Sequence, residues 1–179
     1  MDSRKIALVS LFGALSAALE MIPGIPMPGA EFLKFDIAEA PVLVLTLILD
    51  VYWGLLSVRG LALAIVAVKG DPLGMVYKVV AAASQVVFLY LLRDRPLPRL
   101  SSSFLRAAFM TFFDRATIPL VRGVPVGIKL ASVIFLFNLV QGAINSSVAI
   151  YAYRVAEESE LLCTLGLRTC GQDMEESGF

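Results

Sequence analysis

Residues 128–155 read IKLASVIFLFNLVQGAINSSVAIYAYRV, and this stretch decides what kind of fold to expect. Apart from Lys129 and Arg154 it carries no charge, and it exceeds the ~20 residues that an α-helix needs to cross a bilayer. We interpret it as a membrane helix. Its polar side chains Asn138, Gln141 and Asn145 follow one another at i, i+3 and i+7, so they share one helical face.

The composition supports a membrane environment for the whole chain. Hydrophobic residues make up 58% of the 179 residues and charged residues only 17%, whereas soluble domains contain about 45–50% and about 25% of these classes. An ordinary cytosolic fold and a disordered chain are therefore disfavoured. The 15 basic and 15 acidic residues cancel, which speaks against a nucleic-acid-binding protein.

Five further apolar segments precede the stretch 128–155, and they span residues 6–22, 41–49, 53–68, 73–92 and 104–120. The second is too short to cross roughly 30 Å of hydrocarbon, so it is either a short helix shielded by its neighbours or part of a broken helix. Prolines and glycines force a non-helical loop over 23–39. The sequence predicts an all-α integral membrane protein, a six-helix transmembrane bundle with a short second helix and a proline-rich first outer loop. We expect a membrane domain over 1–156 and a polar cytoplasmic tail over 157–179.

Basic residues predict the orientation of this bundle in the membrane. They precede the first helix, lie in or beside the loop before the fifth, and end the sixth, at Arg4, Lys5, Arg93, Arg95, Arg99, Arg106 and Arg154. Cytoplasmic loops carry an excess of lysine and arginine. We therefore expect a multi-pass protein of the cell membrane with both termini in the cytoplasm and the first loop outside.

The residue types that the sequence lacks exclude several kinds of catalytic and metal site. The sequence contains no histidine, which excludes a Ser-His-Asp triad, a histidine general base and a haem held by histidine. Cys163 and Cys170 are interpreted as unpaired thiols of the tail, since a zinc site normally needs four ligands. No nucleotide-binding motif occurs. We expect no enzyme activity, no metal and no cofactor, and energy for any uphill transport would have to come from another subunit.

Charged residues within the apolar segments, or in the loop that leads into the second segment, mark the candidate site, because charges are costly in a bilayer and face the protein interior or water. They are Lys34, Asp36, Arg59, Lys78, Asp114 and Arg115. Several alternatives stay open at this point. Lys34 is placed either at the lipid surface or in a site, and Asp36 either caps the short helix or binds a ligand. Asp114 either binds a ligand or forms an ion pair with Lys78 or Arg59, and the amides of the last helix either join helices or contact a ligand.

Three short strings carry a resemblance to a known family: Phe32-Leu33-Lys34-Phe35-Asp36-Ile37 followed by Pro41, Gly70-Asp71-Pro72-Leu73-Gly74, and Phe137-Asn138-Leu139-Val140-Gln141-Gly142. Over residues 5–154 the chain resembles the substrate-binding S component of energy-coupling-factor (ECF) vitamin transporters. Within this family it is most similar to the riboflavin-specific member.

The resemblance implies a vitamin held near the outer face, under the first loop. Its implied ligand-binding residues are Leu33, Lys34, Asp36, Lys78, Asp114, Asn138 and Gln141. The implied partners are one membrane coupling subunit and two ATPase subunits. The small residues Gly13, Ala14, Ala17 and Ala18 of the first helix are expected either to dock on the coupling subunit or to pack inside the bundle.

The sequence departs from the riboflavin-specific pattern at a few positions. That pattern has a lysine at the position of Gln141, an asparagine at that of Asp114 and a neutral polar residue at that of Lys78. A different vitamin is therefore one alternative. Another alternative is a small membrane enzyme or a stand-alone channel that uses Asp114 and Arg115 as a polar pathway, although a channel needs polar residues along its full depth.

Overall fold

The computed structural model describes residues 3–28, 30–93, 98–123 and 125–159, together with Leu162 and Leu167. This part of the chain contains six α-helices, as predicted: α1 Ser3–Glu20, α2 Ala40–Ile48, α3 Val51–Ala64, α4 Pro72–Leu91, α5 Pro98–Arg122 and α6 Ile128–Glu158. A π-helical turn, η1 Ile65–Lys69, extends α3. Both cysteines of the predicted tail, Cys163 and Cys170, lie outside the described residues.

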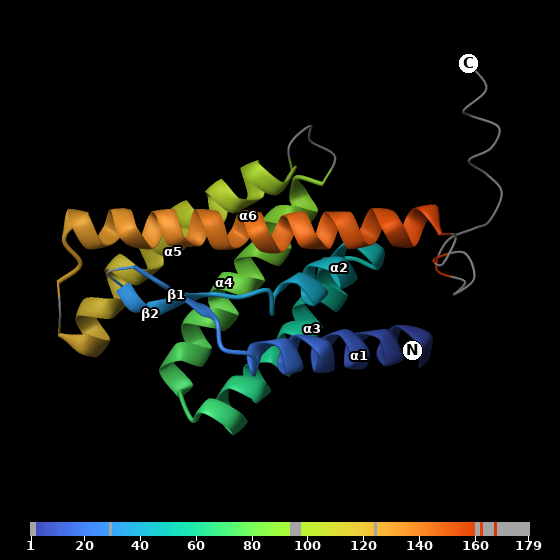
Figure 1. Ribbon diagram of the computed structural model, residues 1–179, viewed down its shortest axis with the longest axis horizontal. Coiled ribbons are helices and arrows are strands. Elements are labelled where there is room, and N and C mark those ends of the chain that lie inside the picture. The colour runs from blue at the N-terminus through green and yellow to red at the C-terminus, as the bar shows by residue number, and fades with distance from the viewer. Residues whose placement is uncertain are drawn as a thin grey trace, which may run out of the picture.

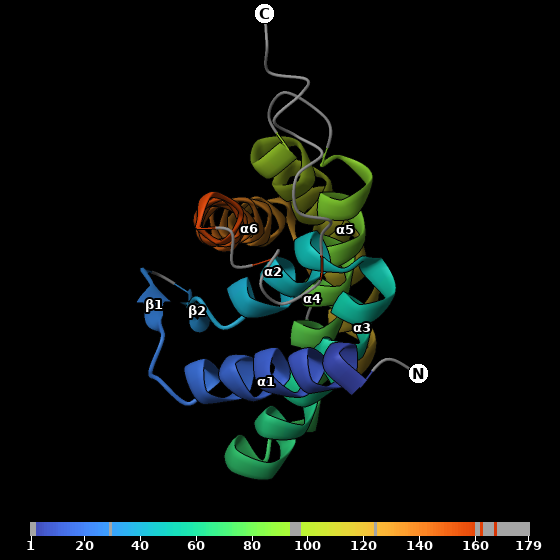
Figure 2. The ribbon, with the colours of Figure 1, turned by 90° about the vertical axis from the view of Figure 1, so that its right-hand side faces the viewer.

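The short helix α2 is the centre of the molecule. It contacts α1, α3, α4 and α6, which surround it in the view along the bundle (Figure 2). All residues from Ala40 to Thr46 are buried, as expected for a helix that is apolar on every side. Pro41 occupies the first turn, where its missing N–H group costs nothing. The prediction of a short second helix shielded by its neighbours is confirmed.

The long helix α6 runs the length of the bundle and packs along α5 (Figure 1). The N-terminal end of α1 and the C-terminal end of α6 lie at the same end of the molecule, at the right in Figure 1. The hairpin that follows α1 lies away from this end. The two ends of the bundle are therefore built from different parts of the chain.

The proline-rich loop after α1 contains a β-hairpin that the sequence analysis did not predict. Strand β1 Ile25–Met27 pairs antiparallel with β2 Ala30–Phe35, with Ile25 opposite Phe35 and Pro26 opposite Lys34. Proline has no N–H to donate to a ladder and is tolerated only at the edge of a sheet. Both strands of a two-stranded sheet are edge strands, so Pro26 can be accommodated here. The predicted all-α fold is therefore correct for the helices but not for this hairpin.

The described surface is rich in large apolar side chains, while the interior contains many polar ones. Leu120 is 85% exposed and Ile128 is 81% exposed, whereas Arg106, Gln85 and Gln141 are among the largest fully buried side chains. Large apolar surface marks contact with lipid or with another protein. Within the described residues, α4 and α6 are long and apolar enough to cross a membrane.

Two aspartates begin helices. The side chain of Asp71 accepts a hydrogen bond from the Gly74 N–H (2.8 Å), and Gly70 before it has a left-handed backbone with φ 61°. Asp50 caps α3 in the same way, by accepting a hydrogen bond from the Tyr52 N–H (2.8 Å). The string Gly70-Asp71-Pro72-Leu73-Gly74 therefore forms the turn and cap that start α4.

We expect Gly54→Ala to lower the free energy of unfolding by about 1–3 kcal/mol through overpacking where α3 crosses α2. A Cβ atom at Gly54 would lie 2.0 Å from Thr46 Oγ1 and 3.2 Å from Val86 Cγ1. Thr46 is buried and donates a hydrogen bond to the Val42 carbonyl (2.8 Å), so it has no free room to move. Denaturant titration of the purified protein in detergent, followed by circular dichroism, measures the change.

Gly127→Ala is the matched control for Gly54→Ala. Nothing lies within 4 Å of a Cβ atom built at Gly127, and its φ of −68° suits alanine. Gly127 is the N-cap of α6, where alanine is less favourable than glycine, so this variant should lose less than about 1 kcal/mol of stability, with no contribution from overpacking. Equal stability of the two variants would show that the α2–α3 contact has room for a methyl group.

Candidate functional site

A cluster of charged side chains lies where the hairpin joins α2. We call it the ion cluster, and its members are Glu20, Asp36, Glu39, Lys78 and Arg106. Lys78 of α4 is its centre: the ammonium group lies 2.6 Å from Asp36 Oδ2, 3.4 Å from Glu20 Oε2 and 3.5 Å from Glu39 Oε1. One lysine thus connects the end of α1, the end of β2 and the start of α2.

The most deeply buried pair of the cluster joins Glu39 to Arg106. Both residues are 1% exposed. The Arg106 guanidinium donates to both oxygens of the Glu39 carboxylate, with 3.0 Å between Nη2 and Oε1. Such two-pronged, charge-assisted pairs are strong and geometrically specific. They fix the start of α2 against α5.

Arg106 corrects one expectation from the sequence. It was counted among the basic residues at the cytoplasmic end, but it is buried inside the bundle. On α5 it shares a buried face with Met110 and Asp114, which follow it at i+4 and i+8, and with its neighbour Ala107. This spacing was the signal in the sequence that could have identified Arg106 as an interior residue.

The ion cluster has a net negative formal charge. Three carboxylates face two cations, so the charge over these described side chains is −1. Buried charges are stable only when they are paired and hydrogen-bonded. Carboxylate oxygens accept hydrogen bonds, so groups that donate hydrogen bonds suit the surroundings of this cluster.

Two amides of α6 hold the backbone of Asp36. Gln141 Nε2 donates to the Asp36 carbonyl oxygen (2.9 Å), and the Asp36 N–H donates to Gln141 Oε1 (3.3 Å). Asn145 Nδ2 donates to the same carbonyl oxygen (3.1 Å). The end of β2 is thus fastened to α6, independently of the ion pair that the Asp36 side chain makes with Lys78.

The structure brings only some of the predicted site residues together. Asp36, Lys78 and Gln141 lie in one place, through the contacts just described. Asn138 is buried on the same face of α6 as Gln141, which confirms the predicted shared face, and its Nδ2 donates to the Ile134 carbonyl (3.0 Å). Leu33 is half-buried and Lys34 is exposed.

Asp114 differs from the other acids of the bundle. It is 6% exposed, and its carboxylate has neither an ion pair nor a hydrogen bond with any residue that the structure describes. The predicted alternative of a pair with Lys78 or Arg59 is therefore not formed there. Arg115 is exposed, on a different side of α5. The two neighbours thus do not form a common polar pathway, and the channel alternative loses its basis.

Aromatic rings border the cluster. Phe35 of β2 lies 4.9 Å from Phe137 of α6, measured between ring centroids. Tyr77, which precedes Lys78, contacts the edge of Phe113 at 5.8 Å, and its hydroxyl donates to Thr117 Oγ1 (3.1 Å). Apolar ring surfaces and buried charges are therefore neighbours in this region, as they are in sites that hold a flat polar molecule.

The small residues of α1 point in two directions. Gly13 is buried against α3, where a Cβ atom at Gly60 would lie 3.1 Å from it, so Gly13 belongs to internal packing. Ala17 is half-buried, whereas Ala14 and Ala18 are exposed. The expectation of an outward docking face is therefore kept for Ala14 and Ala18 and is wrong for Gly13.

The protein is similar to a known protein in its structure rather than in its sequence. No family model matches the sequence, and no curated protein matches it. A solved structure described as the S component of a bacterial ECF transporter superimposes with a TM-score of 0.78 and 20% sequence identity. The match covers 88% of this chain and 98% of that one. The chain has the fold of an ECF S component. At this identity the likeness concerns the fold, and it agrees with the resemblance of the sequence.

Proposed function

We propose that the chain is the substrate-capture subunit of an ECF-type vitamin transporter. The observation that carries this proposal is the likeness to an ECF S component over 88% of the chain. The buried ion cluster beside the hairpin adds a polar site in the region where the sequence resemblance predicts the ligand. No bond of the ligand would be made or broken.

In this proposal the helical bundle spans the cell membrane. Large apolar side chains cover its described surface, and the charged pair of Glu39 and Arg106 is buried inside the bundle, away from lipid. The N-terminal end of α1 and the C-terminal end of α6 lie at one end (Figure 1). Arg154 lies four residues before the end of α6, and Arg93 lies two residues after the end of α4. We assign this end to the cytoplasm by the excess of basic residues.

We propose a flavin as the ligand, with riboflavin as the first candidate. The ligand would contact Leu33, Lys34, Asp36, Lys78, Asp114, Asn138 and Gln141. The negative cluster favours ligand groups that donate hydrogen bonds, such as the hydroxyls of a ribityl chain or the imide N–H of a flavin ring. The rings of Phe35, Phe137 and Tyr77 offer apolar surface for a flat molecule.

The proposed partners are a membrane coupling subunit and two ATPase subunits. The sequence contains no phosphate-binding motif, so the energy for uptake would come from these partners. The exposed side chains of Ala14 and Ala18 leave room for another helix to approach α1 closely. This face is the proposed docking surface for the coupling subunit.

We expect ligand-free protein to quench riboflavin fluorescence, because aromatic side chains stack on the flavin ring. The measurement is a fluorescence titration in detergent, with thiamine as a competitor that should not displace the flavin. No binding at roughly tens of micromolar riboflavin would remove this ligand from the proposal. If no vitamin co-purified with the protein by mass spectrometry either, the capture function itself would be contradicted.

A further inference from the structure

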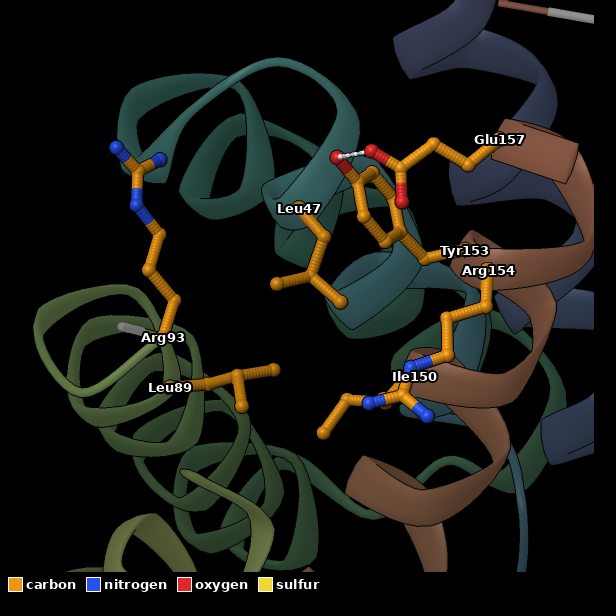
Figure 3. Close-up of a pocket in the computed structure, with 7 residues that line it drawn as sticks. All are labelled: Leu47, Leu89, Arg93, Ile150, Tyr153, Arg154 and Glu157. Atoms are coloured by element: carbon orange, nitrogen blue, oxygen red, sulfur yellow. Dashed lines mark hydrogen bonds between the residues drawn. The ribbon is translucent and has the colours of Figure 1, made fainter. Parts of the chain in front are cut away.

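A pocket lies at the opposite end of the bundle from the hairpin, between α2, α4 and α6 (Figure 3). Its volume is about 420 Å³, within the range of small-molecule sites. The lining residues are Leu47, Leu89, Arg93, Ile150, Tyr153, Arg154 and Glu157. None of them belongs to the ion cluster, so the proposed vitamin site leaves this pocket unexplained.

The rim of the pocket carries two guanidinium groups. Figure 3 shows Arg93 and Arg154 on opposite sides, with Leu47 and Leu89 between them. Arg154 is exposed, and its guanidinium forms no hydrogen bond or ion pair with any described residue. The Arg93 guanidinium lies 4.6 Å from the centre of the Tyr90 ring. Arg154 thus has hydrogen-bond donors that a ligand could use, whereas the Arg93 guanidinium lies against the Tyr90 ring at the edge of the pocket.

The carboxylate at the rim is engaged by a neighbour on its own helix. The Tyr153 hydroxyl donates to Glu157 Oε1 (3.1 Å, dashed in Figure 3). Of the charged side chains that line the pocket, two are arginines and one is a carboxylate, so their formal charges sum to +1. Arginine donors match the oxygens of a phosphate in number and geometry, so an anionic phosphate is the chemical group this rim fits.

The inner wall of the pocket is apolar. Leu89 is fully buried, and Leu47 and Ile150 are partly buried around it. Such a wall gives a free phosphate ion nothing to bind, but it suits the first methylene groups of an acyl chain. The pocket also lies at the ends of α4 and α6, at Leu91 and Glu158, which is the headgroup level in the orientation proposed above.

We propose that this pocket binds the phosphate headgroup of an anionic phospholipid, with Arg154 on the phosphate and the chain over Leu47, Leu89 and Ile150. Basic pockets between membrane helices on the cytoplasmic side are suited to such headgroups. The site goes beyond vitamin capture and rests on the proposed membrane orientation. A soluble phosphate ester shares the phosphate chemistry but lacks the chain, so the test separates the two sources.

The test compares ligands on the full chain in detergent. Binding of short-chain phosphatidylglycerol, short-chain phosphatidylcholine, glycerol phosphate and inorganic phosphate is measured by native mass spectrometry and by thermal shift. We expect phosphatidylglycerol to bind at least about tenfold more tightly than the other three, because it alone combines a net negative headgroup with acyl chains. Equal binding of phosphatidylglycerol and phosphatidylcholine would overturn the proposal. If glycerol phosphate bound as well as phosphatidylglycerol, the site would belong to a soluble ester and the lipid assignment would be wrong.

Arg154→Gln identifies the site, with Arg59→Gln as its matched control. Both arginines are exposed, and Arg59 lies on α3 outside the pocket, so both variants should fold. Arg154→Gln should weaken phosphatidylglycerol binding roughly tenfold, and Arg59→Gln should leave it unchanged. Equal effects of the two variants would overturn the site. Riboflavin binding by Arg154→Gln should equal that of the parent protein. The lipid titration therefore tests the lipid site alone, and the riboflavin titration tests the vitamin proposal alone.

Discussion

Replacing Arg106 with methionine should lower the free energy of unfolding by about 3–5 kcal/mol, because it leaves a buried carboxylate without its main partner. Glu39 would keep only Lys78, whose ammonium lies 3.5 Å away and already bonds Asp36 at 2.6 Å. Methionine fills the volume of the arginine stem, so the loss would report the charge pair rather than a cavity. Denaturant unfolding in detergent, followed by the helical circular dichroism signal, measures it.

The control for Arg106→Met is Arg59→Met, which removes an exposed arginine of α3 and should change stability by less than about 1 kcal/mol. The double variant Glu39→Gln with Arg106→Met should recover part of the loss, since a neutral amide is cheaper to bury than a lone carboxylate. An Arg106→Met protein as stable as the Arg59→Met protein would contradict a stabilising role for the pair.

Asp36→Ala should weaken binding of the vitamin by roughly tenfold to hundredfold, because a hydrogen bond to a buried charged group is lost. The fold should survive this change. The amides of Gln141 and Asn145 hold Asp36 by its backbone N–H and carbonyl, and alanine keeps both groups. The fluorescence titration with riboflavin measures the change, and circular dichroism checks the helices.

Two further variants sharpen the Asp36 result. Glu158→Ala removes an acid at the end of α6, far along the chain from the cluster, and should bind the vitamin as the parent protein does. Asp36→Asn keeps an oxygen that can accept from the Ala38 N–H, as Asp36 Oδ1 does at 3.0 Å, but removes the charge that faces Lys78. Unchanged affinity in both Asp36 variants would place the vitamin elsewhere in the bundle.

The sequence was a good guide to the helices. Long apolar runs separated by proline, glycine and charged residues predicted all six, and α2 was recognised as short because the run over 41–49 is bounded on both sides. Ends were less certain. Helix α5 begins at Pro98, before the apolar run that starts at residue 104, because its first residues are polar, and hydropathy does not distinguish polar helix residues from loop residues.

The hairpin and the ion cluster were harder to predict, for different reasons. Prolines and glycines in residues 23–29 predicted a non-helical loop, and only the pairing of β1 with β2 shows that this loop contains strands with Pro26 at an edge. Glu39 and Arg106 are 67 residues apart, and the sequence around either residue does not indicate that the other is its partner. The site residues Asp36, Lys78 and Gln141 were identified individually, but which of them touch depends on how four separate elements meet.

The length of α2 sets an order of events while the proposed membrane protein is made. A helix of nine residues cannot cross roughly 30 Å of hydrocarbon, and an unpaired charge in lipid costs about 2.5–3.5 kcal/mol. Helix α2, with Glu39 at its start, is therefore unstable in the bilayer by itself. Its partner Arg106 is synthesised 67 residues later, on α5. Glu39 can pair with Lys78 as soon as α4 is made, and its two-pronged partner Arg106 follows on α5. Because α6 also packs on α2, the surroundings of α2 are complete only when the last helix is in place.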